Sequence, residues 1–355
     1  MAIETHSARK RRPHERVGEG GRRLNSAGSA IVVALCALVL GALLNAPGIH
    51  KSAAIQPEGW KRDLALAVTG PLESVSHALL LDRPRGAVKA VLGRSDDDEI
   101  DTAVAVSGGR GSEPEPSTPP PTPKRVRFSP DRPLRLWIAG DSLVVVPGES
   151  LLRAVAGNRA VEPARRIDGR IASGLERPDV FNWFTHIREE MRKRKPRAVV
   201  VMFGGNDDHN FMTGLPEGTS IGSFGTPSWT AEYGRRVAGI MDTITRRDAY
   251  LVWIGLPISQ DTEQTQRFDA INAIVQKEAA RRPGRVSYLD TYFFFAGDDG
   301  GFAEYIADDS GRLVKMRADD GVHFERPAGD LIATKILRLL NERYDLTSWR
   351  STPTR

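Results

Sequence analysis

From residue 134 onward, short apolar runs alternate with longer amphipathic stretches. The apolar runs predict strands at residues 134–140, 164–167, 198–203, 250–256 and 286–289. The amphipathic stretches predict helices at residues 148–157, 178–194, 230–247, 263–281 and 328–344. The runs at 198–203 and 250–256 are almost wholly apolar, as is typical of parallel strands covered on both faces. The alternation predicts a three-layer α/β/α domain over residues 134–345, with a mostly parallel sheet of about five strands.

A different pattern precedes this domain, because residues 27–46 carry no charged side chain. About 20 such residues are enough to cross a bilayer as a helix. The basic residues of segment 1–26 outnumber its acidic residues, which by the positive-inside rule places that end in the cytoplasm and the rest of the chain outside. We therefore expect a disordered basic cytoplasmic tail at 1–26, a single transmembrane anchor at 27–47 and an extracytoplasmic domain.

A cleaved signal peptide is the alternative to the anchor, since the most apolar part, residues 31–44, is short for a membrane span. Signal peptidase prefers small residues at alternating positions before the cut. The sequence Leu44-Asn45-Ala46 matches that preference poorly. The sequence thus favours an uncleaved anchor.

Two segments lie between the anchor and the domain. Residues 57–95 show apolar positions at helical spacing, with Gly70-Pro71 and Arg83-Pro84 as expected helix starts. They predict short membrane-proximal amphipathic helices that lie on lipid, pack on the domain or a partner, or form a plain stalk. Residues 100–133 are rich in Gly, Ser, Glu and Pro and predict a flexible linker. Residues 346–355 are expected to be a tail.

Charge and cysteine content exclude some classes of protein. The formal net charge is +5, but the excess of basic residues is concentrated in the N-terminal tail. The rest of the chain is close to balanced, so we expect no nucleic-acid partner. The chain contains one cysteine, Cys36, which rules out an intrachain disulfide framework.

Four short polar motifs occur in order along the predicted domain: Gly140-Asp141-Ser142-Leu143, Ser173-Gly174, Gly204-Gly205-Asn206-Asp207 and Asp320-Gly321-Val322-His323. The first and third begin where predicted strands end. In an open parallel sheet, the ligand crevice lies at the carboxyl ends of the strands. The motifs are therefore expected to meet at one site.

These motifs contain the groups needed for acyl transfer through a serine. Ser142 is the expected nucleophile, although a serine directly after a strand is also a common helix N-cap. Of the seven histidines, His323 is the best candidate base, because Asp320 three residues earlier can orient its ring. Asp319 is a rival for that role, at a less suitable spacing.

An oxyanion hole completes the expected site. The N–H groups of Ser142 and Gly174 and the side-chain amide of Asn206 can donate to the negative charge of a tetrahedral intermediate. Gly169 competes with Gly174 for this role. We expect Asp141 and Asp207 to be structural, each bracing the turn in which it lies.

A metal site is an alternative interpretation of Asp207, Asp208 and His209. Two loop carboxylates and one histidine without further ligands are a weak signal for a metal. The sequence thus predicts neither a metal nor another cofactor.

The four motifs resemble those of the SGNH (GDSL) hydrolase superfamily over about residues 134–345. Ser142, Gly174, Asn206 and the Asp320-x-x-His323 pair match the superfamily's four blocks, and the second block departs from its commonest form. Phrases such as Ser173-Gly174-Leu175 and Tyr292-Phe293-Phe294 are similar to a bacterial membrane-anchored subfamily described as a domain of unknown function. The resemblance implies a three-layer α/β/α fold and a metal-free Ser-His-Asp mechanism, but no particular substrate.

We therefore expect a membrane-anchored extracytoplasmic serine esterase or deacylase that acts on acylated envelope glycans or lipids. An O-acyltransferase of envelope polysaccharide, working with a membrane acyl-donor partner, is the first alternative, because the same triad serves both reactions. A non-catalytic envelope module is the second.

Overall fold

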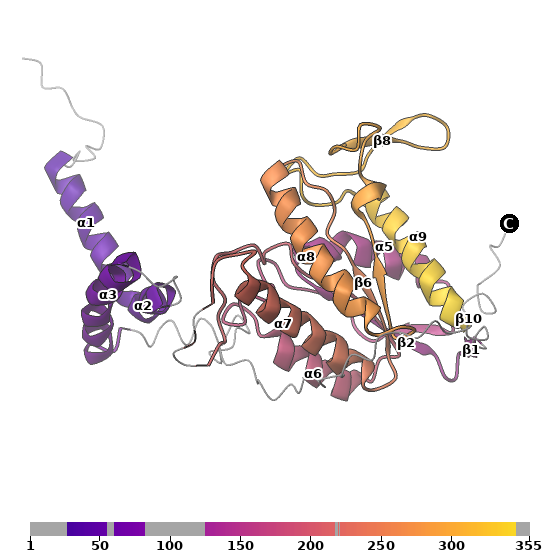
Figure 1. Cartoon of the computed structure of the whole chain (residues 1–355), viewed down its shortest axis with the longest axis horizontal. Coiled ribbons are helices and arrows are strands. Elements are labelled where there is room, and N and C mark those ends of the chain that lie inside the picture. Colours follow the sequence, from indigo (N-terminus) through magenta and orange to yellow (C-terminus); the bar gives the residue numbers. More distant parts are fainter. Residues whose placement is uncertain (1–26, 55–59, 82–124, 217–218, 220, 346–355) are drawn as a thin grey trace, which may run out of the picture.

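The computed structural model describes residues 27–54, 60–81, 125–216, 219 and 221–345 (Figure 1). The basic tail expected at 1–26, most of the expected linker and the tail expected at 346–355 lie outside these residues. The described residues form an N-terminal group of helices and one α/β domain.

Three helices form the N-terminal part: α1 (Ala27–Leu44), α2 (Ala46–Ala54) and α3 (Trp60–Ala78). Two hydrogen bonds connect them, from Ser76 Oγ to the Leu43 carbonyl at 2.7 Å and between His50 Nδ1 and Thr69 Oγ1 at 3.0 Å. The prediction of a helix start at Gly70-Pro71 is wrong, because Pro71 lies inside α3. The segment around Arg83-Pro84 is outside the described residues.

The segment predicted as a transmembrane anchor forms α1 and the beginning of α2. The expected continuous helix over 27–47 is interrupted, since α1 ends at Leu44 and α2 begins at Ala46. The large apolar side chains of α1 are mostly exposed. Of the helices that the structure describes, none reaches the combination of length and apolar character required for a membrane span.

A parallel sheet forms the centre of the main domain. Its strands run in the order β3 (Val161–Pro163), β2 (Leu134–Gly140), β5 (Ala198–Met202), β6 (Tyr250–Ile254) and β7 (Val286–Leu289). All neighbouring pairs are parallel, and β5 and β6 are buried at every position. The predicted α/β fold with a mostly parallel sheet is confirmed.

One predicted strand is wrong. The chain expected to be extended at 164–167 pairs with β2 instead through two short pieces, β3 before it and β4 (Asp168–Gly169) after it. Between them the chain leaves the sheet at Arg165 and Arg166, whose charged side chains keep contact with solvent. Arg165 Nη1 donates to Asp168 Oδ2 at 3.2 Å, which spans the interruption.

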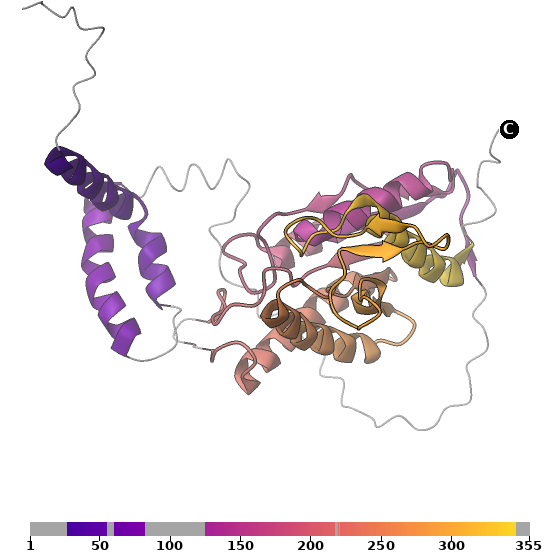
Figure 2. The same cartoon turned by 90° about the horizontal axis from the view of Figure 1, so that it is seen from above.

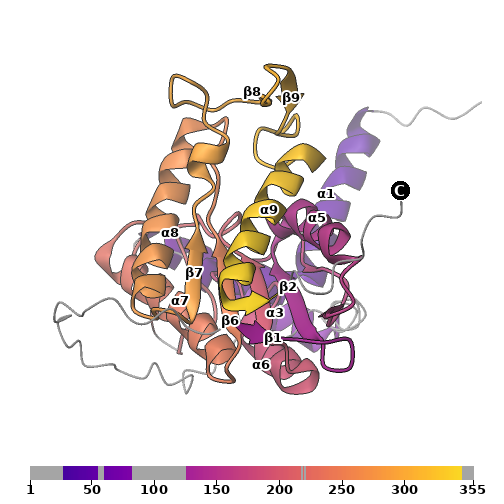
Figure 3. The same ribbon diagram turned by 90° about the vertical axis from the view of Figure 1, so that its right-hand side faces the viewer.

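Helices cover both faces of the sheet (Figures 2 and 3). α5 (Val145–Val155) and α9 (Arg326–Arg343) pack together on one face, and α6 (Trp183–Arg194), α7 (Pro227–Thr245) and α8 (Thr262–Ala280) cover the other. Right-handed crossovers require this division, because the chain first moves from β2 to β3 and then reverses towards β7. The reversal places a crevice between the carboxyl ends of β2 and β5.

Two small sheets extend the domain. Val126 and Arg127 form β1, which pairs in parallel with β10 (Tyr344–Asp345). The chain is thus part of the domain from Val126 onward, so the linker expected at 100–133 ends earlier than predicted. An antiparallel hairpin, β8 (Tyr305–Ala307) and β9 (Leu313–Lys315), precedes the Asp320–His323 motif and lies beyond the helix ends in Figure 1.

Candidate active site

Ser142 lies directly after the first strand of the sheet, at the start of a short 3₁₀ turn, η1 (Ser142–Val144). The turn begins at Gly140, which has φ of +153°. A Cβ atom at this position would lie 2.1 Å from the Met202 carbonyl oxygen of β5, so only glycine fits. The close approach of the two strands therefore presents the half-buried Ser142 at the crevice.

Asp141 holds this turn from the protein interior. Its buried carboxylate accepts hydrogen bonds from the Leu143 N–H and the Gly205 N–H, both at 2.9 Å. The second bond ties the first motif to the third. Burial raises the pKa of Asp141 to about 7, although the two N–H donors act in the opposite direction. Asp141 is structural, as predicted.

The histidine from the far end of the chain meets Ser142. His323 Nε2 lies 2.8 Å from Ser142 Oγ, and His323 Nδ1 lies 2.7 Å from Asp320 Oδ2. An ionised carboxylate can only accept, so Nδ1 carries the proton and Nε2 is left to accept from the serine hydroxyl. This tautomer is the one required for a general base.

The turn Asp320–His323 orients its own carboxylate. Asp320 Oδ1 accepts from the N–H groups of Val322 and His323, both at 2.9 Å, while Oδ2 faces the imidazole. Partial burial alone would raise the pKa of Asp320, but these N–H donors and the histidine lower it to about 2. The rival Asp319 bonds to Lys315 instead.

Arg317 holds this turn from the interior, and sequence reasoning missed it. Its fully buried guanidinium donates to the carbonyls of Gly321, Val322 and His323 at 3.2, 2.7 and 3.3 Å and to the Ile258 carbonyl at 2.5 Å. Burial lowers the pKa of Arg317 to about 10, so it remains a cation at neutral pH. No sequence signal distinguished it from other arginines.

Three aromatic rings surround the same guanidinium. The rings of Phe295, Phe302 and Phe324 lie 5.7, 5.2 and 5.3 Å from the Arg317 guanidinium carbon. Faces of aromatic rings stabilise a cation where water is excluded. The carbonyl dipoles and the rings together replace a carboxylate partner, which Arg317 lacks within 4 Å among the described residues.

Two of the predicted oxyanion donors, Gly174 and Asn206, lie next to each other. Asn206 Nδ2 donates to the Ser173 carbonyl at 3.0 Å, which places the amide beside Gly174. Neither the Ser142 N–H nor the Gly174 N–H has a hydrogen-bond acceptor among the residues the structure describes. Gly169, the rival, is part of the β4 ladder, paired with Gly140. The arrangement favours Gly174 as the second backbone donor.

Gly174 is held against a buried carboxylate. Asp207 accepts from the N–H groups of Leu175 and Glu176 at 2.8 and 3.0 Å and from the Tyr233 hydroxyl at 2.9 Å. A Cβ atom on Gly174 would lie 1.9 Å from Asp207 Oδ1, so a side chain there would displace the carboxylate. Burial raises the pKa of Asp207. It is structural, as expected.

Glu176 is a second buried carboxyl group next to the Ser173-Gly174 motif. Its carboxylate accepts from Trp229 Nε1 at 2.9 Å and from the backbone N–H of His209 at 3.0 Å. Burial raises the pKa of Glu176 to about 7. Trp229 is fully buried. Glu176 therefore links the chain just after the third motif and the first turn of α7 to the core.

The side chains of the alternative metal motif point to three different partners. Asp207 faces the core, Asp208 pairs with Arg267 at 2.9 Å, and the His209 ring lies 3.1 Å from Glu176 Oε2. They do not converge on a common point. Within the described residues, these three side chains offer no ligand cage.

Comparison with known protein families assigns most of the α/β domain to one family. The family described as "Protein of unknown function (DUF459)" matches residues 135–339. The chain belongs to this family. Because the family is SGNH-like, the resemblance to the SGNH hydrolases is confirmed. Membrane anchoring of the subfamily stays a prediction. No curated protein matches the chain.

Several solved structures show a distant likeness. A putative acylhydrolase from Bacteroides fragilis is 13% identical, covers 59% of this chain and 87% of its own, with a TM-score of 0.39. An acetylxylan esterase from Geobacillus stearothermophilus is 16% identical, covering 58% and 93%, with a TM-score of 0.41. A family 3 carbohydrate esterase from Clostridium thermocellum is 13% identical, covering 59% and 98%, with a TM-score of 0.37. At this level of identity, none of these likenesses identifies a substrate for this chain.

Proposed function

We propose that the protein is a serine esterase or deacylase that acts on acylated cell-envelope glycans or lipids. One observation carries the proposal: the His323 imidazole lies between Ser142 Oγ at 2.8 Å and the Asp320 carboxylate at 2.7 Å. A nucleophile, a base in reach and a group that orients the base are the signature of an activated serine.

Acylation is the first step of the proposed reaction. His323 Nε2 takes the proton of Ser142 as Oγ attacks the ester carbonyl, and Asp320 stabilises the imidazolium that forms. The N–H groups of Ser142 and Gly174 and the amide of Asn206 bind the oxyanion, each contributing roughly 3 kcal/mol to barrier reduction. His323 then gives the proton to the leaving alcohol.

Deacylation repeats the sequence with a new nucleophile. His323 removes a proton from water, which attacks the acyl-serine, and the collapse of the second tetrahedral intermediate releases the acid and restores Ser142. If the hydroxyl of a sugar replaces water, the product is a new ester. The His323 side chain is 41% exposed, so the base is open to an alcohol acceptor, which keeps O-acyl transfer as the second candidate.

We also propose that α1 attaches the protein to a membrane, with the domain outside the cytoplasm. The support is the uncharged sequence of α1 and the exposure of its apolar side chains, for example Ile31 at 60% and Leu38 at 69%. Burial of such surface in lipid is favourable. When membranes are extracted at alkaline pH, the full chain should stay in the pellet, and the Leu38→Asp variant should be released into the supernatant.

The function is tested by profiling the full chain on short-chain esters, long-chain esters and acetylated glycans. We expect hydrolysis that Ser142→Ala abolishes, while Ser287→Ala, at the opposite end of the sheet, retains it. Net acylation of an added glycan in the presence of an acyl donor would instead identify a transferase. Equal, background-level turnover by the wild type and Ser142→Ala on all substrates would contradict both and leave a non-catalytic module.

A further inference from the structure

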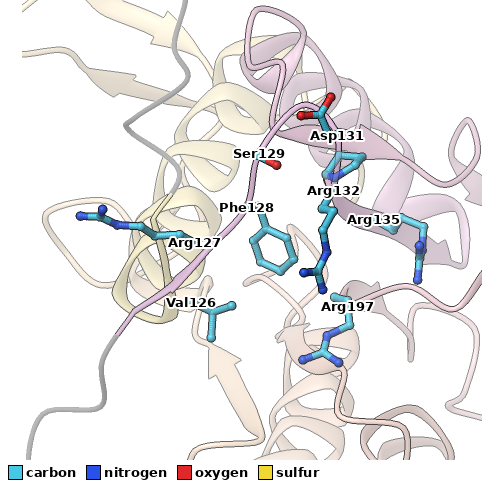
Figure 4. Close-up of a pocket in the computed structure, with 9 residues that line it drawn as sticks. Val126, Arg127, Phe128, Ser129, Asp131, Arg132, Arg135 and Arg197 are labelled. Atoms are coloured by element: carbon cyan, nitrogen blue, oxygen red, sulfur yellow. The ribbon is translucent and has the colours of Figure 1, made fainter.

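A pocket lies at the opposite end of the sheet from Ser142. It has a volume of about 890 Å³, within the range of small-molecule sites. The side chains that matter for its chemistry are Val126, Arg127, Phe128, Arg132, Arg135 and Arg197 (Figure 4). Four of these six are arginines.

Hydrogen bonds and a ring contact hold the backbone that lines the pocket. Ser129 and Arg132 close a tight turn with two backbone hydrogen bonds of 3.2 and 3.0 Å, and the Phe128 ring packs edge-on against Tyr344 at 5.4 Å. The backbone of Arg197 is fixed by bonds to Arg135, Tyr250 and Tyr344, between 2.8 and 2.9 Å. A preformed wall lowers the entropic cost of binding a ligand.

Two of the arginines have local partners. Arg127 pairs with Asp345 at 3.4 Å, and Arg135 Nε donates to the Lys195 carbonyl at 2.9 Å. Arg132 and Arg197 lie within 4 Å of no carboxylate in the described part of the chain. The Arg132 side chain runs beside the Phe128 ring and Arg197 lies below it, while the carboxylate of Asp131, which also lines the pocket, lies at the top of the turn, away from both guanidinium groups (Figure 4).

We propose that this pocket binds a ligand that carries a phosphate group, with Arg132 and Arg197 as its two main donors. A guanidinium offers a planar fork of N–H donors that matches oxyanions. A phosphate presents oxygens in several directions around one atom, so two forks can bind it at once. A carboxylate has two coplanar oxygens and is matched by one fork. The apolar wall of Phe128 and Val126 accommodates the rest of the ligand.

The site is separate from the proposed triad. Arg135 is near the start of β2 and Ser142 follows its end, so the intervening strand places them roughly 20 Å apart. Phosphate binding here therefore does not depend on the proposed esterase activity.

Titration calorimetry of the full chain in a non-ionic detergent tests the site, with inorganic tripolyphosphate as the probe and citrate as the carboxylate comparison. We expect the wild type to bind tripolyphosphate at least about tenfold more tightly than citrate. The double substitution Arg132→Ala/Arg197→Ala should weaken tripolyphosphate binding by about tenfold or more. Thermal melting checks that this variant is folded.

The matched control removes the same charge from the same end of the domain. Arg246→Ala/Arg247→Ala, two exposed arginines just before β6, should leave the affinity almost unchanged. Arg132→Lys/Arg197→Lys keeps the charge but loses the planar forks, and should bind with intermediate affinity. Phosphatidylglycerol in mixed micelles is the second probe, and it distinguishes a lipid headgroup from a soluble phosphate as the natural ligand. Loss of the binding of either probe in the Arg132→Ala/Arg197→Ala variant supports the site.

Three results would overturn the proposal. The first is no measurable binding of tripolyphosphate or phosphatidylglycerol. The second is equal weakening in both double alanine variants, which would show a diffuse charge effect. The third is citrate binding as tight as that of tripolyphosphate.

Discussion

Ser142 and His323 meet at 2.8 Å, yet the two segments that carry them are held in opposite ways. The Ser142 turn rests on the buried Asp141, which accepts from the N–H groups of Leu143 and Gly205. The chain just after Gly174 rests in the same way on the buried Asp207, which accepts from two further N–H groups. The His323 turn rests on a buried cation, Arg317, which donates to backbone carbonyls. One half of the site is thus fixed by buried carboxyl groups that accept hydrogen bonds, and the other half by a buried cation that donates them.

The difference shows how a turn is fixed by whichever backbone groups it leaves unpaired. Motifs that follow strands leave N–H groups without partners, and a buried carboxylate satisfies them. The Asp320 carboxylate already satisfies the N–H groups of its own turn, so the carbonyls remain. A guanidinium with several N–H donors is suited to satisfy these.

The largest effect should come from the turn that carries His323. Asp320→Asn removes the carboxylate that orients His323, and kcat/KM on a small ester should fall by about 10³- to 10⁴-fold, by analogy with other triads. Asp319→Asn is the control, since Asp319 bonds to Lys315, and should change kcat/KM little. Comparable losses in the two variants would contradict the assignment of Asp320.

Substitution of a buried carboxyl group near Ser142 should reduce the stability of the fold. Asp207→Asn replaces one of the two oxygens that accept three hydrogen bonds with an NH₂ group that can only donate, and should lower the free energy of unfolding by about 3 kcal/mol. Asp208→Asn, the neighbouring residue in an ion pair near the surface, should cost about 1 kcal/mol or less. Urea denaturation followed by tryptophan fluorescence measures both, and equal costs would show that Asp207 does not brace the site.

Arg317 should affect catalysis indirectly, because it positions the turn that carries His323. Arg317→Met removes the four contacts to carbonyls, and kcat should fall about 10²-fold with little change in KM, because the His323 turn shifts. Arg312→Met, an exposed arginine of the same hairpin region, is the control. Partial rescue by Arg317→Lys is expected, and a change in KM alone would contradict a positioning role.

The pH dependence of stability should have opposite signs in the two halves. The pKa of Asp141 is raised to about 7 from 3.8, so the folded state binds the proton that the unfolded state has lost, and stability falls as pH rises from about 4 to 7. Asp320, with its pKa lowered to about 2, stabilises above about pH 4, and this contribution is lost as pH falls towards 2.

Unfolding titrations across this pH range separate the two effects. Asp141→Asn should reduce the downward slope between pH 4 and 7 by up to about 1.4 kcal/mol per pH unit, the limit for one proton. Glu176, with a pKa of about 7, should retain part of the slope in that variant. Asp320→Asn should remove the rise in stability that the wild type shows as pH increases from about 2 to 4. An unchanged slope in Asp141→Asn would contradict the buried-acid account.

The sequence predicted the sheet well because its strands are strongly patterned. β2 runs over the predicted residues 134–140, and β5 and β6 begin at the predicted residues Ala198 and Tyr250. Long apolar runs covered on both faces leave little ambiguity. The edge was harder, since β3 and β4 are short pieces and β1, β8, β9 and β10 depend on pairing between distant or irregular segments.

The site could be predicted where a residue type does chemistry, and not where it supports the chemistry. Ser142, Asp320 and His323 meet as the motifs predicted, because each motif has a fixed spacing and follows an identifiable element. Arg317 could not be found in the same way. Its role depends on four carbonyls and three rings that only the folded chain assembles, and an arginine beside acidic residues reads from sequence as a surface ion pair.

The most direct test of the account is covalent labelling of Ser142. A fluorophosphonate should form one adduct per full chain, located by mass spectrometry on the peptide containing Ser142, and the adduct should be lost in Ser142→Ala and nearly lost in His323→Ala. Labelling that is absent from the wild type, or that persists unchanged in His323→Ala, would contradict a serine activated by this histidine.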